Sequence, residues 1–68
     1  MNLDRKATQD LFIRICKDSG FQLDAFRVAA LVGAVLGCTP FVVYLTMDIN
    51  LSTMKEIAAG THPAALKA

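Results

Sequence analysis

The chain has 68 residues, of which 54% are hydrophobic and 19% are charged, and its formal net charge is +1. This length allows one domain, and a domain this small is marginally stable unless a partner chain, a metal or disulfides support its core. The near-zero charge argues against strong electrostatic attraction to nucleic acid. One histidine and two widely spaced cysteines argue against a metal cluster.

The first predicted helix covers residues 4–19 and is amphipathic. Its apolar stripe consists of Leu3, Ala7, Leu11 and Ile15, widened by Phe12 and Cys16. Ile13 lies on the otherwise polar side, so it is either a solitary exposed residue or part of an interface. Gly20 follows the last turn and is expected to end the helix.

The second predicted helix covers residues 24–36, with Asp24 as its N-cap and Gly37 after its end. Its body is apolar on every side except at Arg27, which is typical of a helix in lipid or inside a packed structure. A chain of this length can hardly surround such a helix, so we expect a second copy to cover it. The predicted dimer interface consists of Phe26, Ala30, Val32, Gly33 and Ile13.

Two short helices are predicted next, over residues 40–47 and 51–59. Thr39 is a good N-cap and Pro40 suits the first helical position. Either Asn50 or Ser52 caps the next helix, and Gly60 ends it. Residues 64–68 are predicted to form a loosely ordered tail.

Several residues in this second half are spaced as in a known family. Leu36-Gly37-Cys38-Thr39 resembles the "LG-x-T/S" that closes that family's first helix, and "AAGTHP" resembles its "ENG-K-x-P" ending. The inward positions are matched by Val43, Met47, Ile49, Met54 and Ile57. From about Arg27 to Leu66, the chain therefore resembles the repressor/Cro-type (xenobiotic-response-element type) helix-turn-helix family.

The resemblance implies an all-α fold, a small four-helix domain with a C-terminal helix-turn-helix over 40–47 and 51–59. It also implies a homodimeric DNA-binding regulator of the phage or mobile-element type, acting in the cytoplasm. Its two reading helices would address half-sites about one DNA turn apart. The residues expected to face DNA are Asn50, Leu51, Ser52, Lys55 and Glu56, with Thr39, Thr61 and His62 beside the backbone.

Two alternatives stay open. From residue 39 onward, Lys55 and Lys67 are balanced by Asp48 and Glu56, whereas phosphate neutralisation supplies most non-specific DNA affinity. A helix-turn-helix that has gained apolar residues such as Phe41, Val42 and Leu45 can instead hold a protein, for instance as an inhibitor of a host or phage factor.

The second alternative is a membrane peptide that spans the bilayer once. Residues 28–47 carry no charge and are long enough for a single span. The Gly37, Thr39 and Pro40 signals at the middle of this stretch argue against one continuous helix, so a membrane span is the less favoured of the two alternatives.

No enzyme activity, cofactor, metal site or catalytic residue is predicted. Cys16 or Cys38 could pair with His62 as nucleophile and base, but no third orienting group has a recognisable spacing. Both cysteines are expected to be reduced thiols in a cytosolic protein.

Overall fold

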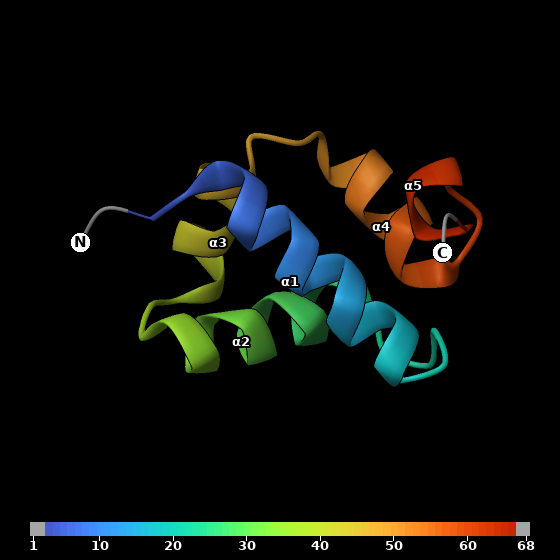
Figure 1. Ribbon diagram of the computed structural model, residues 1–68, viewed down its shortest axis with the longest axis horizontal. Helices are drawn as coiled ribbons and strands as arrows, with labels where there is room; N and C mark the ends of the chain where they lie inside the picture. Colours follow the sequence, from blue (N-terminus) through green and yellow to red (C-terminus); the bar gives the residue numbers. More distant parts are fainter. Residues whose placement is uncertain (1–2, 67–68) are drawn as a thin grey trace.

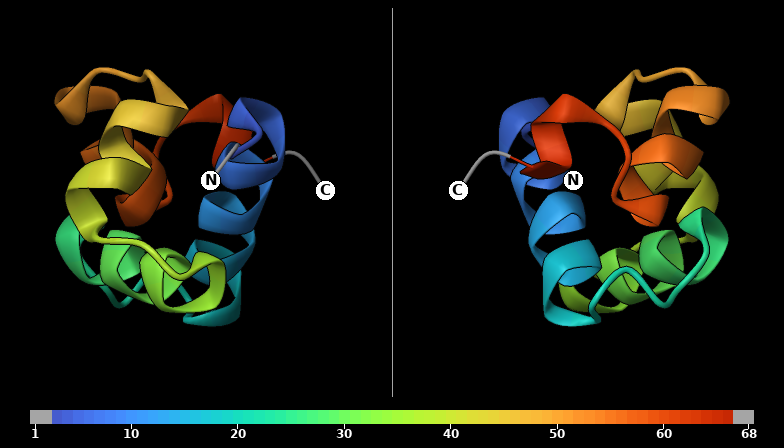
Figure 2. Two further views of the ribbon diagram at one scale, coloured as in Figure 1. Left: turned by 90° about the vertical axis from the view of Figure 1, so that its left-hand side faces the viewer. Right: turned by 90° about the vertical axis from the view of Figure 1, so that its right-hand side faces the viewer.

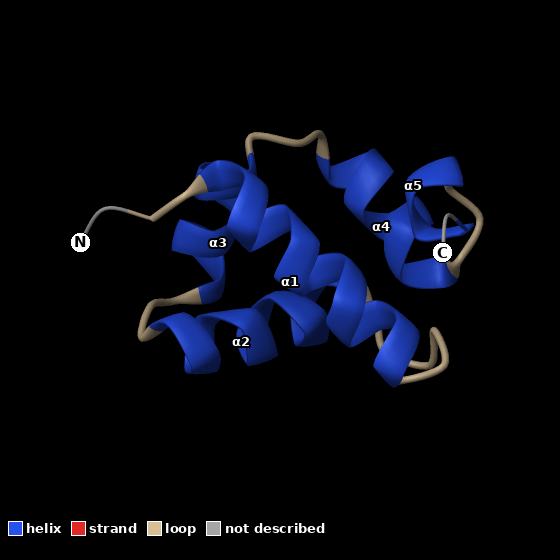
Figure 3. Cartoon of the chain, in the orientation of Figure 1, coloured by secondary structure: helices blue, strands red, loops and turns tan. Residues whose placement is uncertain are grey.

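Local start and stop signals in the sequence determine where each helix begins and ends. The computed structural model describes residues 3–66, and over that range it contains helices and loops without any strand (Figures 1 and 3). The helices are α1 (Arg5–Asp18), α2 (Ala25–Leu36), α3 (Pro40–Met47), α4 (Leu51–Ala59) and α5 (Pro63–Leu66). The all-α class is therefore confirmed, and the first four helices lie within one residue of their predicted bounds.

Side-chain caps explain why the helices begin where they do. Asp24, Thr39 and Asn50 each accept a hydrogen bond from a backbone N–H in the first turn of their own helix. Of the two candidates for the α4 cap, Asn50 is therefore the one used. Gly37 and Gly60 end α2 and α4 in the left-handed conformation. The predicted boundaries follow from this local chemistry.

The core is built where α1 lies across the other helices. α1 packs against α2, α3, α4 and α5 (Figures 1 and 2). The buried hydrophobic side chains are those of Phe12, Cys16, Ala25, Val28, Ala29, Val32, Val43, Met47, Met54, Ile57, Ala58 and Ala65. Helices two to five thus share one core with α1.

The buried face of α1 is rotated from the predicted stripe. Thr8, Phe12 and Cys16 are buried, whereas Ala7 is exposed. Thr8 can occupy this face because its hydroxyl donates to the Asp4 carbonyl oxygen at 2.7 Å, which satisfies the buried polar atom. The predicted stripe did not include Thr8, but its members Phe12 and Cys16 are buried as expected, and Leu11 and Ile15 pack against the core.

Two expectations for the dimer interface are wrong, because the residues lie inside a single chain. Val32 is fully buried and Gly33 is also buried, since α2 packs against both α1 and α3 and the turn at Cys38 and Thr39 lies against Gly33. Ala30 and Ile13 are half-buried, and Ile13 packs against the core. Phe26 alone of the predicted set is exposed, by 55%.

The expected loose tail is instead partly helical. α5 begins at Pro63, and the Nδ1 atom of His62 accepts a hydrogen bond from the Ala64 N–H at 3.1 Å. Ala65 is only 2% exposed, and α5 packs against α1 and α4. Burial of a small apolar residue therefore orders this turn; residues 67–68 of the predicted tail lie outside the described range.

The uncharged stretch 28–47 is divided between two helices. α2 and α3 meet with a bend of 95°, and together they have the length and composition of a span. Within residues 3–66, no single helix is both long and apolar enough to cross a membrane.

Candidate interaction surface

α2 and α3 meet at 95° across the turn 37–39. Two helices of a helix-turn-helix are likewise joined at about 90–120° by a short turn that often contains glycine. The turn is tight because Gly33 lies against it. A Cβ atom added there would stand 2.4 Å from the Cys38 carbonyl oxygen.

The pair predicted to form this motif was α3 with α4. Within the described residues, however, α3 packs mainly against α2 and α1, and α4 packs mainly against α1, α2 and α5. Val43, Met47, Met54 and Ile57 are buried as expected, and Ile49 packs beside them. They contribute to the common core, so their burial alone does not identify a crossing of α3 and α4.

The residues predicted to face DNA are mostly exposed but do not gather at one place. Those exposed are Asn50, Leu51, Ser52, Lys55, Glu56, Thr39 and Thr61, while His62 is half-buried. The turn before α3 and the loop after α4 lie at opposite ends of the long axis (Figure 1). The set therefore extends along the molecule.

Several of these side chains already bond to their own backbone. Asn50 and Thr39 cap helices, and His62 accepts from the Ala64 N–H. Thr61 donates its hydroxyl hydrogen to the Glu56 carbonyl oxygen at 3.3 Å. These groups have a structural use that requires no DNA.

Many of the cationic side chains are close to carboxylates. The exposed ion pairs are Arg5–Asp48 at 3.9 Å, Lys6–Asp10 at 3.4 Å, Arg14–Asp18 at 4.0 Å and Arg27–Asp24 at 4.0 Å. Each pair is weak, because both partners are solvated. The pairing nevertheless places positive and negative charge side by side on the surface of the described residues.

The outward side of α3 is strongly apolar. Phe41 is 69% exposed and Leu45 is 79% exposed, and Tyr44 is half-buried on the same side. The three follow an i, i+3, i+4 spacing, which places them on one helix face. We call Phe41, Tyr44 and Leu45 the α3 ridge.

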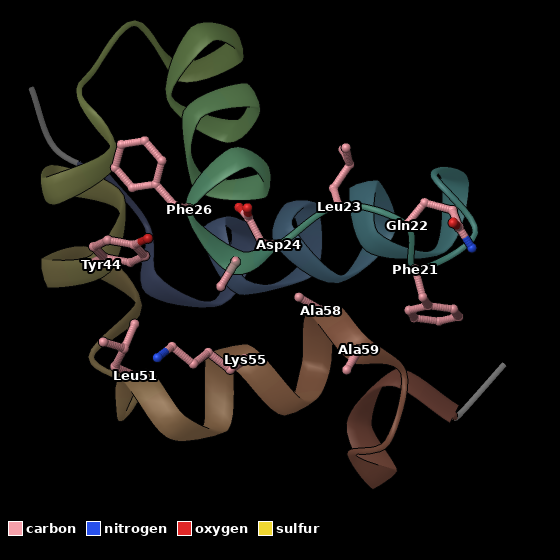
Figure 4. Close-up of a pocket in the computed structure, with 11 residues that line it drawn as sticks. Phe21, Gln22, Leu23, Asp24, Phe26, Tyr44, Leu51, Lys55, Ala58 and Ala59 are labelled. Carbon is pink, nitrogen blue, oxygen red and sulfur yellow. The ribbon is translucent and has the colours of Figure 1, made fainter.

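A groove lies beside the ridge. It has a volume of about 650 Å³ and is formed by the loop before α2, the first turn of α2, the middle of α3 and one side of α4 (Figure 4). Apolar lining residues include Phe21, Leu23, Phe26, Tyr44, Leu51 and Ala59. We call this concavity the α2/α4 groove. Tyr44 belongs to both the ridge and the groove, so the two are continuous.

Gln22, Asp24, Tyr44 and Lys55 place polar groups along the groove. Asp24 is at the start of α2, Lys55 extends from α4 toward Tyr44 and Leu51, and the Tyr44 hydroxyl comes from α3 (Figure 4). Burial, with a smaller contribution from the Asp24 carboxylate, raises the pKa of Tyr44. The hydroxyl therefore stays protonated and can donate a hydrogen bond.

The two cysteines differ in burial, and neither belongs to a metal-binding cluster among the described residues. Cys16 is fully buried, and that burial raises its pKa to about 11, whereas a reactive cysteine has a lowered pKa. Cys38 is a free, half-buried thiol. No group of three or more His, Cys, Asp or Glu residues suited to a metal ion occurs among the described residues.

The ridge was partly predictable from the sequence, because Phe41, Val42 and Leu45 were the apolar residues that suggested a protein-binding surface. The groove was not, because it joins three segments that are separated along the chain. Comparison with known proteins adds no assignment: no protein family, curated protein or solved structure matches this chain.

Proposed function

We propose that this chain is a protein-binding module whose docking surface is the α3 ridge. The observation that carries the proposal is the exposure of Phe41 and Leu45, 69% and 79%, on a helix without any charged residue. Exposed apolar patches mark interaction sites, and aromatic side chains are enriched among the residues that dominate binding energy.

α3 is held firmly enough to present these side chains in one orientation. Its N-terminus is fixed by the Thr39 cap and the close contact at Gly33. Its C-terminus is tied to α1, because the Gln9 Nε2 atom donates to the Met47 carbonyl oxygen at 2.8 Å. A preorganised ridge loses little conformational entropy on binding, which favours an apolar cavity on a partner protein as its target.

A site-specific photo-crosslink tests this function. A photoreactive phenylalanine derivative is placed at Phe41, or at exposed Arg14 on α1 as the matched control, and irradiated in the native host cells. We expect a discrete adduct with a different protein from position 41 only, and its loss when Leu45→Glu is added. Equal adducts from both positions, or none with another protein, would contradict the proposal.

DNA binding is a second candidate, supported by the 95° helix-turn-helix geometry of α2 and α3. In this case a cytoplasmic homodimer would occupy operator DNA through α3, the second helix of that pair, whereas the predicted contacts Ser52 and Lys55 lie on α4. A gel-shift assay on the DNA upstream of its own gene should then show sequence-dependent binding that weakens as salt rises. Absence of a complex with that DNA, even at low salt, would remove this candidate.

A further inference from the structure

We propose that the α2/α4 groove is the docking site for the α3 ridge of a second copy of this chain, in a reciprocal dimer. The ridge is a convex apolar surface, and the groove is a concave apolar surface of about 650 Å³. Both are continuous through Tyr44. Each chain therefore carries both halves of one contact.

Twofold symmetry limits this arrangement to two copies. In such an interface the same patch of both subunits is used, and if residue i contacts j, then j contacts i. When the ridge of one copy enters the groove of the other, the second ridge faces the first groove. Both apolar surfaces are then covered without leaving a free end for further copies.

The exposed apolar area agrees with what a small dimer needs. Phe26, Phe41, Leu45 and Leu51 are 55%, 69%, 79% and 52% exposed. An aromatic side chain has about 150–250 Å² of surface and the smaller leucine somewhat less, so the exposed fractions of these two phenylalanines and two leucines amount to on the order of 500 Å² per copy. Two copies would bury about 1,000 Å², which is the size that a specific interface should reach.

The charges of the groove do not oppose this occupant. The ridge itself is uncharged, so no charge enters the groove with it. Asp24 is exposed and close to Arg27, at 4.0 Å, and the exposed Lys55 can keep its ammonium group in water while its stem covers apolar surface. Docking thus leaves no buried, unpaired charge.

This inference deepens the proposed function and rests on the ridge being a docking surface. It identifies what covers the ridge when no other protein is bound. A target protein would then compete with self-association, because both need Phe41 and Leu45. Binding of the target would be linked to dissociation of the dimer.

Sedimentation equilibrium on four proteins tests the dimer. These are the unmodified chain, the ridge variant Leu45→Glu, the groove variant Ala59→Arg, and Ala34→Arg, which places the same charge on an exposed α2 position that does not line the groove. We expect dimers for the unmodified chain and Ala34→Arg. For the ridge and groove variants, the dissociation constant should rise about a hundredfold or more, with helicity by circular dichroism unchanged.

Mixing the two weakened variants tests the reciprocal contact itself. In the mixed pair, an intact ridge meets an intact groove, and the introduced glutamate faces the introduced arginine. We therefore expect the mixture to form heterodimers although neither variant dimerises alone. A monomeric unmodified chain, undiminished dimers of either variant, or a mixture without heterodimers would overturn the inference.

The outcomes separate this inference from the proposed function. A crosslink to another protein from a chain that never dimerises would leave the proposed function standing and remove the dimer. If the mixed variants dimerise but position 41 crosslinks only to a second copy of this chain, the dimer would stand and binding to a different protein would be contradicted.

Discussion

Gly33 decides how closely α3 can approach α2. In an open helix, replacing glycine by alanine stabilises by up to about 1 kcal/mol, because alanine has the better helix propensity. Here the added Cβ would stand 2.4 Å from the Cys38 carbonyl oxygen, a backbone atom that cannot rotate away. The steric conflict outweighs the propensity, so the usual sign of this substitution should be reversed.

We therefore predict that Gly33→Ala lowers the free energy of unfolding by about 1–3 kcal/mol, the usual cost of overpacking. Urea denaturation followed by circular dichroism measures the change. Ala34→Gly, at the neighbouring exposed position, is the control and should cost about 1 kcal/mol through propensity alone. Stabilisation by Gly33→Ala would show that the turn is looser than described.

Cys16 should make stability depend on pH in the alkaline range. Its pKa rises from 9.0 to about 11 on burial, so between these values the unfolded chain loses the thiol proton while the folded chain keeps it. Stability is then fully present below pH 9 and falls as the pH rises toward 11, by up to roughly 1.4 kcal/mol per pH unit.

The variant Cys16→Ala isolates this effect. It will be less stable at neutral pH, because it leaves a cavity, but it should lose less stability than the unmodified chain between pH 9 and 11. Urea denaturation at a series of pH values gives both slopes. Parallel slopes would mean that Cys16 does not titrate with unfolding.

At the scale of single helices, the sequence predicted the helix ends but not how the helices pack against one another. Asp24, Thr39 and Gly60 predicted helix ends correctly, because a cap depends only on neighbouring backbone groups. The buried face of α1 was predicted to within one position: Phe12 and Cys16 are buried as expected, but Thr8 takes the place of Ala7, because the exact face depends on which helices contact it. The helical turn at α5 was missed for the same reason: it depends on burial of Ala65 against other helices.

The packing of α4 against the core depends on the apolar side chains of its buried face. Ile57 is 2% exposed, and Ile57→Asp would bury an unpaired carboxylate, which costs several kcal/mol. A domain of this size has a total stability of roughly 3–10 kcal/mol. We predict loss of the cooperative thermal transition, measured by circular dichroism, whereas Ser52→Asp on the exposed side should keep it. A folded Ile57→Asp variant would contradict the described register of α4.

The stability of α5 depends on the hydrogen bond that the His62 side chain accepts at its start. His62→Ala removes the acceptor for the Ala64 N–H and should lower the free energy of unfolding by about 1 kcal/mol. His62→Asp restores an acceptor and should recover most of this loss. Chemical denaturation of both variants provides the comparison. Equal losses would show that the ring contributes by packing rather than by capping.

At the scale of the whole molecule, the sequence was sufficient to predict the succession of helices, but not to predict which side chains are exposed or where the groove lies. Phe41 and Leu45 were recognised as unusual, yet their exposure depends on which face α3 turns toward α2. The predicted dimer residues Val32 and Gly33 failed because a 95° bend lets one chain cover them. The groove could not be predicted, since its walls come from segments that meet only after folding.

The described residues 3–66 close one core within a single chain. The Cα radius of gyration is 10.6 Å, close to the roughly 11 Å expected for a compact chain of this length and far below the roughly 25 Å of an unfolded one. Small-angle X-ray scattering at high dilution should therefore give a compact monomer. A radius near the unfolded value would show that folding requires a second chain.

The unequal burial of the two thiols has a kinetic consequence. An alkylating reagent can reach half-buried Cys38 through small local fluctuations near the α2–α3 turn, whereas the fully buried Cys16 can react only after a larger opening of the core. The two labelling rates therefore report two different motions of one chain. The rate at Cys38 measures local opening of the turn that precedes the ridge, and the rate at Cys16 measures opening of the core around this thiol.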